Sequence, residues 1–520
     1  MIIFRPARQS VTLYLYASIS GILLAISSLY PSFFLLTWIA FIPLVFAVQN
    51  SQSLLSAYIL GLCSGFTLYS ISTYWLVDFI MIFKGYGTIT SVALSSLYWI
   101  YCAQMLALVS ALTWHYKKYY SLIWLFPILI TIAFAYYPTL FSVQVGETQS
   151  RFLLALQGIS YTGVHGLDFI VALVNILILQ AINGRSEVPK HSTALAYGLI
   201  VLWFGYGIYG LQTWEPLSKN WPALNVGIVQ SNHPPQAFSD GPQPGYSLSY
   251  PLEMALTEKL VEQDVDIVIW PETTSNHYYA KEFVKTAFQR HISEWQTPLI
   301  FQDYESLVIQ GEFQHYSTST YLDNKGELAG QYRKIKRIPF AEYLPWLDES
   351  LAFKRLLKRY LGDFFSNLMP GPGAKVFRTD RAAYMPMICY EVMFPEFVAN
   401  SVVATKNPDI LVVQSNNSWF GDTRQPFQHL AASVLRSVEN RLPLVHVINN
   451  GPGAIIVPSG RQLMQTDYKE TAAYAVEVPV LDTEHPSFYT KHPRLFILGI
   501  TTVFLLMMLQ PGLRKLVTRY

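Results

Sequence analysis

Long apolar runs separated by short polar breaks fill the first 214 residues of the chain. A helix of about 20 apolar residues crosses a bilayer, so these runs predict membrane-spanning helices. Seven runs precede a more polar region and an eighth closes the chain; the second, fifth and eighth are short. They are Val11–Leu29, Phe33–Val48, Leu55–Val77, Ile89–Trp114, Leu122–Tyr137, Val164–Ile182, Leu195–Leu211 and Leu495–Leu509. The pattern predicts an α-helical membrane domain of about eight transmembrane helices.

The pattern changes between Asn225 and Val480. Short apolar runs bounded by Gly, Pro and Asn alternate there with amphipathic stretches, which is typical of a layered α/β domain. The expected strands cover residues 225–230, 265–270, 382–388, 409–415, 444–449 and 453–458, and two expected helices cover residues 251–263 and 426–441. We therefore divide the chain into a membrane domain (1–214), an α/β domain (222–488) and a closing transmembrane helix (494–511).

The charge distribution supports this division. Only 12 of the 70 Lys, Arg, Asp and Glu residues lie in the first 214 positions. The whole chain is 13% charged, against about 25% for an average soluble domain. The net charge of +2 argues against a nucleic-acid partner, which would require a strongly basic face.

Lys and Arg in the short loops predict the orientation, because they concentrate on the cytoplasmic side. With a cytoplasmic N-terminus, nine basic residues lie in inside loops and two, Lys84 and Arg151, lie outside. The inside set is Arg5, Arg8, Lys117, Lys118, Arg185, Lys190, Arg514, Lys515 and Arg519. Seven crossings then place the α/β domain on the outer side of the membrane.

The chain has three cysteines. Cys63 and Cys102 fall in predicted spans, where a small apolar residue is common. Cys389 is alone in the α/β domain and therefore has no partner there for a disulfide. An unpaired thiol in an oxidising compartment is a candidate nucleophile, although a buried core cysteine remains the alternative.

Polar residues follow several expected strands, where layered sheets usually place their chemistry. Glu272 follows one strand, Cys389, Tyr390 and Glu391 follow another, and Asn416 follows a third; the segment 332–345 adds Lys334 and Glu342. A carboxylate can take the thiol proton, and a lysine can stabilise the thiolate and an oxyanion. Taken singly, each residue could instead be a turn cap, a solvated charge or a loop carboxylate.

No metal is expected, because none of the 11 histidines shows paired ligand spacing. The proposed chemistry needs no cofactor either.

The order Glu272, Lys334, Cys389 resembles the Glu-Lys-Cys triad of the nitrilase, or carbon–nitrogen hydrolase, superfamily. Over nearly its full length the chain resembles a membrane-embedded branch of it, the apolipoprotein N-acyltransferase family. The resemblance rests on "LLTWIAFIPLVFA", "TYWLVDF", "VGIVQSNHP", "WPET", "YRKIKRIPFAEYLP", "CYE", "SNNSWFGDTRQPFQHL" and "NNGPGAIIVPSG". It implies an αββα sandwich fold for the α/β domain, in a bacterial inner membrane with that domain facing the periplasm.

The resemblance also implies roles for the matched residues. Glu272 would be the general base, Lys334 the oxyanion lysine and Cys389 the nucleophile. Glu342 would position the triad, and Tyr390 and Glu391 would help to bind or orient substrate. The implied reaction is ping-pong: Cys389 takes an acyl chain from a phospholipid, typically phosphatidylethanolamine, and passes it to the α-amine of a diacylglyceryl-cysteine in an apolipoprotein.

The chain departs from the family pattern at several positions. Ala341 stands where Gly is usual, Asn417 stands where Asp is common, Arg441 is shifted, and the closing segment 487–496 lacks the usual Gly-Asp. These departures leave open a divergent acyltransferase with another substrate preference. Residues 351–365 additionally predict a basic amphipathic helix, which could lie at a lipid interface or pack on the domain core.

Two other functions fit parts of this sequence less well. A membrane-tethered amidase would use the same triad, but eight spans exceed what a tether needs. A transporter would need charges inside its spans, and only Asp78 and Asp168 lie near span ends.

Overall fold

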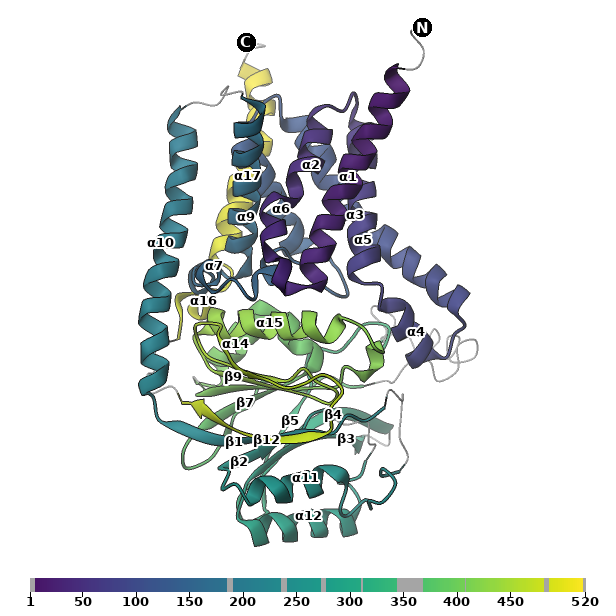
Figure 1. Ribbon diagram of the computed structural model, residues 1–520, viewed down its shortest axis with the longest axis vertical. Helices are drawn as coiled ribbons and strands as arrows, with labels where there is room; N and C mark the ends of the chain where they lie inside the picture. Colours follow the sequence, from purple (N-terminus) through teal and green to yellow (C-terminus); the bar gives the residue numbers. More distant parts are fainter. Residues whose placement is uncertain are drawn as a thin grey trace. The chain divides into compact units, whose positions relative to one another are not determined.

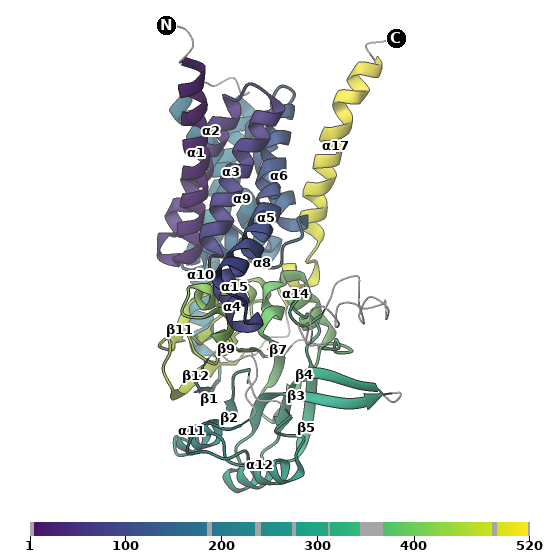
Figure 2. The same ribbon diagram turned by 90° about the vertical axis from the view of Figure 1, so that its right-hand side faces the viewer.

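The computed structural model describes residues 5–184, 190–234, 241–272, 277–309, 312–343, 368–406, 408–480 and 486–517. The chain divides into two units (Figures 1 and 2). The helical unit comprises Met1–Val77, Gly87–Thr213 and Ser487–Tyr520, and the α/β unit comprises Asp78–Tyr86 and Trp214–Pro486. The expected amphipathic helix at 351–365 lies outside the described residues.

The helical unit is a bundle of apolar helices, and each predicted run is helical over most of its length. The principal helices are α1 (Arg5–Leu29), α2 (Thr37–Gln49), α3 (Leu54–Ser72), α5 (Thr88–Tyr116), α6 (Leu122–Tyr136), α9 (Val164–Asn183), α10 (Lys190–Asn220, whose last turns belong to the α/β unit) and α17 (Leu495–Val517). Within the described residues, six helical segments are long and apolar enough to cross a membrane, and the apolar parts of α6 and α17 are shorter. The number of eight transmembrane helices therefore stays a prediction.

The third predicted run, Leu55–Val77, extends beyond the C-terminal end of the observed helix. We expected it to reach Val77, but α3 ends at Ser72, and α4 (Leu76–Lys84) follows after a break. Thr73 terminates α3: its backbone leaves helical geometry, and its hydroxyl donates to the Tyr69 carbonyl (2.6 Å) and accepts from the Trp99 indole (3.0 Å). Most of α4 consequently belongs to the α/β unit.

Glycines let α1, α3 and α5 pack closely. A Cβ atom at Gly61 would lie 2.3 Å from the Leu106 carbonyl oxygen of α5, and one at Gly21 would lie 2.4 Å from the Ser64 carbonyl oxygen of α3. Small residues are the usual means of close helix packing in a membrane, where apolar burial supplies little driving force between helices.

The α/β unit contains two six-stranded sheets with helices on their outer faces (Figure 1). The strand orders are β12-β1-β2-β3-β4-β5 and β11-β10-β9-β8-β7-β6, and β1-β2-β3 and β7-β8-β9 run parallel. Helices α11 (Leu252–Val261) and α12 (Glu282–Trp295) cover the first sheet, and α14 (Pro395–Ala404) and α15 (Gln425–Asn440) cover the second. The predicted fold class, a helical membrane domain with an αββα sandwich, is confirmed at this level.

All six predicted strands form, within three residues at each end: β1 (Ala223–Gln230), β2 (Ile267–Ile269), β7 (Ala383–Ile388), β8 (Ile410–Ser415), β9 (Leu444–Ile448) and β10 (Ala454–Ile456). Six strands were not predicted: β3 (Leu299–Ile309), β4 (Glu312–Leu322), β5 (Leu328–Arg333), β6 (Phe377–Arg378), β11 (Gln462–Gln465) and β12 (Ala472–Pro479). The predicted strands are nearly all buried, so they read as apolar runs, whereas most of the missed ones are partly exposed and more polar.

The main core lies between the two sheets. Val226, Ile228 and Ile269 of the first sheet pack there with Val412 and Val445 of the second, and each is at most 1% exposed. A second cluster fills the space under α11 and α12. Because this packing fixes the sheets face to face, residues at the carboxyl ends of strands from both sheets can share one site.

Candidate active site

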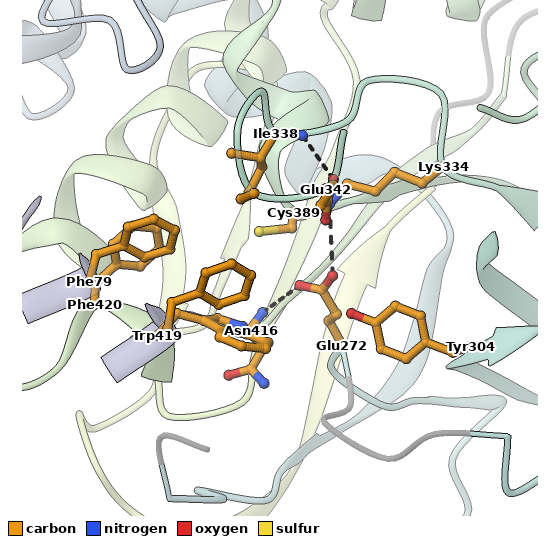
Figure 3. Close-up of a pocket in the computed structure, with 12 residues that line it drawn as sticks. Phe79, Glu272, Tyr304, Lys334, Ile338, Glu342, Cys389, Asn416, Trp419 and Phe420 are labelled. Atoms are coloured by element: carbon orange, nitrogen blue, oxygen red, sulfur yellow. Dashed lines mark hydrogen bonds and ion pairs between the residues drawn. The ribbon is translucent and has the colours of Figure 1, made fainter. Parts of the chain in front are cut away.

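Residues from both sheets and from α4 line one open cavity of about 510 Å³, a volume that includes open solvent (Figure 3). Its polar part contains two carboxylates, a lysine, an asparagine and the thiol of the sequence prediction, and the rest is mainly aromatic and aliphatic. The lining residues are Phe79, Phe83, Glu272, Tyr304, Lys334, Ile338, Ala341, Glu342, Cys389, Asn416, Trp419 and Phe420. The structure therefore brings together Glu272, Lys334, Glu342, Cys389 and Asn416, which the sequence predicted to converge.

Cys389 occupies a sharp turn. It directly follows β7 and begins a short 3-10 helix, η3 (Cys389–Met393). Its φ of +50° is in the left-handed region, which costs a non-glycine residue about 1 kcal/mol or more. The surrounding contacts must hold this conformation, and strained turns of this kind are concentrated at functional sites.

Glu391 provides part of that support. Its fully buried carboxylate accepts hydrogen bonds from the backbone N–H of Ile388 (2.8 Å), Ile335 (2.7 Å) and Lys336 (3.0 Å) and from the Tyr332 hydroxyl (2.7 Å). These bonds tie the end of β7 to the segment that follows Lys334. Glu391 does not line the described cavity, so its position indicates support of the site.

Glu272 lies just beyond β2 with its carboxylate in the cavity. One carboxylate oxygen accepts from the Asn416 backbone N–H at 3.0 Å, and the other lies 3.9 Å from Lys334 Nζ. Burial raises the pKa of Glu272 to about 7, although Lys334 opposes this shift. A carboxyl with this pKa exchanges protons readily near neutral pH, as a general base must.

Lys334 and Glu342 form a buried ion pair. Lys334 Nζ is 2.7 Å from one Glu342 oxygen, and the other oxygen accepts from the Ile338 N–H at 2.8 Å. Burial by itself lowers the pKa of Lys334, but the carboxylates of Glu342 and Glu272 outweigh it and hold that pKa well above the usual range. Lys334 is only 1% exposed. It is therefore a fixed positive charge inside the cavity and not part of a solvated basic face.

The surroundings of the Cys389 thiol raise its pKa and so favour its protonated form. Burial and the Glu272 carboxylate raise its pKa well above the usual range, while Lys334 lowers it. A thiol in this setting needs a base to become a nucleophile. Glu272 is the adjacent candidate, because the two side chains interact directly.

Asn416 and Tyr390 have distinct positions. The Asn416 side-chain oxygen accepts from Asn449 Nδ2 at 3.1 Å and from the Ser418 hydroxyl at 2.6 Å. These bonds fix the turn whose N–H contacts Glu272. Tyr390 packs edge-to-face on Phe394, with ring centroids 4.9 Å apart, and does not line the described cavity.

The aromatic wall of the cavity was not predicted. Phe79 of α4 stacks on Phe420 (centroids 5.1 Å apart), and Phe83 contacts Trp419 edge-to-face (5.2 Å). Tyr304 of β3 also lines the cavity. The predicted apolar run extends to Val77, so the sequence did not show α4 as a separate helix. The i, i+4 spacing of Phe79 and Phe83 does place the two rings on one face of a helix, and this spacing could have indicated α4.

The departures from the family pattern also have structural positions. Ala341 lines the cavity. Arg441 ends α15 at a φ of +56° and donates to the Pro458 carbonyl at 2.9 Å, so it is a buried structural residue. Asn417 lies beside His429. Among the described residues, no group of three or more His, Cys, Asp or Glu side chains is arranged to hold a metal ion.

Two family models match the chain. Residues 20–177 match the apolipoprotein N-acyltransferase N-terminal domain, and residues 210–482 match carbon-nitrogen hydrolase. A Geobacter metallireducens protein named apolipoprotein N-acyltransferase is 29% identical over 93% of this chain and 92% of its own length. A Rickettsia typhi protein of the same name is 26% identical over 95% of this chain and 98% of its own length.

Among solved structures, an amidase from Nesterenkonia sp. is similar at 16% identity and a TM-score of 0.35, covering 52% of this chain and 92% of its own. The carbon-nitrogen hydrolase model accounts for more than half of the residues, including Glu272, Lys334 and Cys389. The chain therefore belongs to the carbon–nitrogen hydrolase family.

Proposed function

We propose that this protein transfers an acyl chain from a phospholipid, through a thioester on Cys389, to the N-terminal α-amine of diacylglyceryl-cysteine in apolipoproteins. The observation that carries the proposal is the cavity itself, in which a thiol, a carboxylate of pKa about 7 and a buried lysine adjoin an aromatic wall. Relatives named apolipoprotein N-acyltransferase that match over nearly the full length favour acyl transfer over hydrolysis of a soluble amide.

In the first half-reaction Glu272 takes the thiol proton, and the Cys389 sulfur attacks the ester carbonyl of the phospholipid. The carbonyl oxygen becomes an oxyanion, which the Lys334 ammonium stabilises; one such donor typically contributes about 3–4 kcal/mol. The tetrahedral intermediate then collapses, the ester C–O bond breaks, and protonated Glu272 returns the proton to the departing lysophospholipid oxygen. A thioester on Cys389 remains.

In the second half-reaction the neutral α-amine of the acceptor attacks the thioester carbonyl. Lys334 again stabilises the oxyanion, and Glu272 takes a proton from the attacking nitrogen. The C–S bond breaks, the amide is released, and the sulfur recovers the proton from Glu272. Thiol, base and lysine thus return to their starting states, as a ping-pong cycle requires.

Glu342 supports both half-reactions by holding Lys334 at 2.7 Å while its own second oxygen is fixed by Ile338. The aromatic wall of Phe79, Phe83 and Phe420 offers apolar surface to an acyl chain. Asn416 and Glu391 support the site by fixing its turns, and Tyr390 packs on Phe394 directly after the nucleophile. We further propose phosphatidylethanolamine as the donor, and the inner membrane with the α/β unit on the periplasmic side as the location.

The test uses the full chain in lipid nanodiscs that contain phosphatidylethanolamine with a labelled acyl chain. The acceptor is a synthetic diacylglyceryl-cysteine peptide with a free α-amine, and its N-acetylated form is the control. We expect label in the free-amine peptide as an alkali-stable amide, together with lysophospholipid, and no transfer to the control. Release of labelled fatty acid without peptide labelling would identify a hydrolase and contradict the proposal.

A further inference from the structure

His429 lies on α15 with both ring nitrogens in hydrogen bonds. Its Nε2 is 3.0 Å from the Cys389 carbonyl oxygen, and its Nδ1 is 3.1 Å from the side-chain oxygen of Asn417. The side chain is 2% exposed. Because a carbonyl oxygen can only accept, Nε2 must carry a proton and donate to Cys389.

The proton at Nδ1 depends on Asn417. With the Asn417 oxygen toward Nδ1, as it is placed, the ring needs protons on both nitrogens and is a cation. Burial lowers the pKa of His429 to about 4, and the nearby positive charge of Lys334 acts in the same direction. A neutral ring has a bare Nδ1, which requires a donor.

Turning the Asn417 amide over supplies that donor. The two ends of an amide have almost the same shape. With its oxygen toward Nδ1, the Asn417 amide nitrogen is buried without a hydrogen-bond partner among the described residues. In the turned orientation the nitrogen donates to Nδ1, and the group left without a partner is a carbonyl oxygen, which is tolerated more often than an unpaired N–H.

The other groups around the ring are compatible with a neutral His429. His446 meets it edge-to-face, with centroids 5.0 Å apart, and is itself held by the hydroxyls of Ser415 (2.8 Å) and Ser433 (2.9 Å). Hydroxyls can donate or accept hydrogen bonds, so these two contacts are compatible with either tautomer of His446. The Cys389 carbonyl requires the proton on Nε2, and Asn417 decides whether Nδ1 is bare and the ring neutral.

We propose that His429 is a positioning residue for the nucleophile: its neutral Nε2–H tautomer, selected by an amide donor from Asn417, holds the Cys389 carbonyl and with it the strained turn. Glu391 fixes the preceding residue through the Ile388 N–H, so the turn is held from both sides. This inference rests on the proposed function of Cys389 as the nucleophile.

The test compares two substitutions of similar polarity. In His429→Gln the amide nitrogen can reach the position of Nε2, whereas in His429→Asn it reaches only that of Nδ1. We expect Gln to keep the rate of Cys389 acylation within about threefold and Asn to lower it by about 10- to 100-fold, the scale of a misplaced reacting group. Alkylation of Cys389 by iodoacetamide should follow the same order. Equal rates in the two variants, whether high or low, would overturn the proposal.

A second measurement covers the case in which His429→Asn fails to fold. Asn417→Asp replaces the amide donor by a carboxylate, which only accepts; beside an ionised Asp, the Cys389 contact persists only if the ring becomes a cation. We expect the alkylation rate of this variant to gain an ionisation between about pH 5 and pH 8, near the ordinary His pKa, which disappears in the double variant with His429→Gln. A profile identical to that of the parent would overturn the tautomer assignment.

Iodoacetamide needs no lipid site, so the two proposals can fail separately. A parent protein that is alkylated but never acylated by phospholipid would contradict the proposed function alone.

Discussion

Replacing Glu342 by Gln should lower the pKa of the general base. Glu342 and Glu272 both face Lys334 Nζ, at 2.7 Å and 3.9 Å, and the Glu342 charge raises the pKa of Glu272. The two facing oxygens are therefore at most about 7 Å apart; at that separation and an effective dielectric constant of about 20, two like unit charges repel by about 2 kcal/mol. Removing one of them should therefore lower the Glu272 pKa by about one to two units.

The expected result is a shift of the pH–rate profile toward acid. Glu272 acts when deprotonated, so acylation in the parent should rise with pH through a midpoint near 7, the pKa of Glu272. In Glu342→Gln the midpoint should lie near pH 5 to 6. The plateau rate should also fall, by about tenfold or more, because one amide cannot reproduce both carboxylate contacts of Glu342. The assay is single-turnover acylation of Cys389 by phospholipid at a series of pH values.

Glu305→Gln is the matched control. Glu305 pairs with Arg333 at 2.7 Å, directly beside Lys334 in the sequence, and does not line the cavity. The same loss of charge there should leave the midpoint near 7. A Glu342→Gln midpoint that stays near 7 or rises would refute the assignment of Glu272 as the base that Glu342 repels.

Three further outcomes are expected. Cys389→Ala should stay folded but form no acyl-enzyme, whereas Cys63→Ala, within α3, should retain activity; loss of activity in the latter at normal expression would mean that the reactive thiol is misassigned. Lys334→Met should slow acylation by about 10²- to 10³-fold and raise the apparent thiol pKa, so that alkaline pH restores alkylation but not acylation; an unchanged alkylation profile with normal acylation would remove the lysine from the site. Gly61→Ala should destabilise the helical unit by about 1–3 kcal/mol, seen as a lower Tm, because its Cβ would meet the Leu106 carbonyl, whereas Gly198→Ala meets nothing within 4 Å and should not.

Fully buried elements were the easiest to predict from the sequence. The strands that precede Glu272 and Cys389 are continuous apolar runs, so their ends and the polar residues beyond them could be located. β3 and β4 were missed because their outer halves are exposed and carry polar residues without a clear two-residue period. Whether a strand could be predicted therefore depended on its burial and not on strand propensity alone.

The sequence indicated site residues by their chemistry, by polar positions after buried strands and by the order Glu, Lys, Cys. Glu272, Lys334 and Cys389 were singled out in this way, and the structure brings them into one cavity. His429 was not, because its role depends on a hydrogen bond to a backbone carbonyl 40 residues away. Phe79 was not predicted as a site residue, because hydrophobicity alone does not distinguish an aromatic residue of a membrane helix from one that lines a cavity. Such contacts arise only from the tertiary fold.

The most direct test of the central claim is the mass of the peptide that contains Cys389 after a single turnover with phosphatidylethanolamine and no acceptor. We expect this peptide to gain the mass of one acyl chain, to lose it on treatment with neutral hydroxylamine, as a thioester does, and to lose it when the free-amine acceptor is added. The Glu272→Gln variant should gain the acyl chain about 10²- to 10⁴-fold more slowly, as expected for loss of a general base. An acyl group found on another residue, or transfer to the acceptor that persists in Cys389→Ala, would contradict the account.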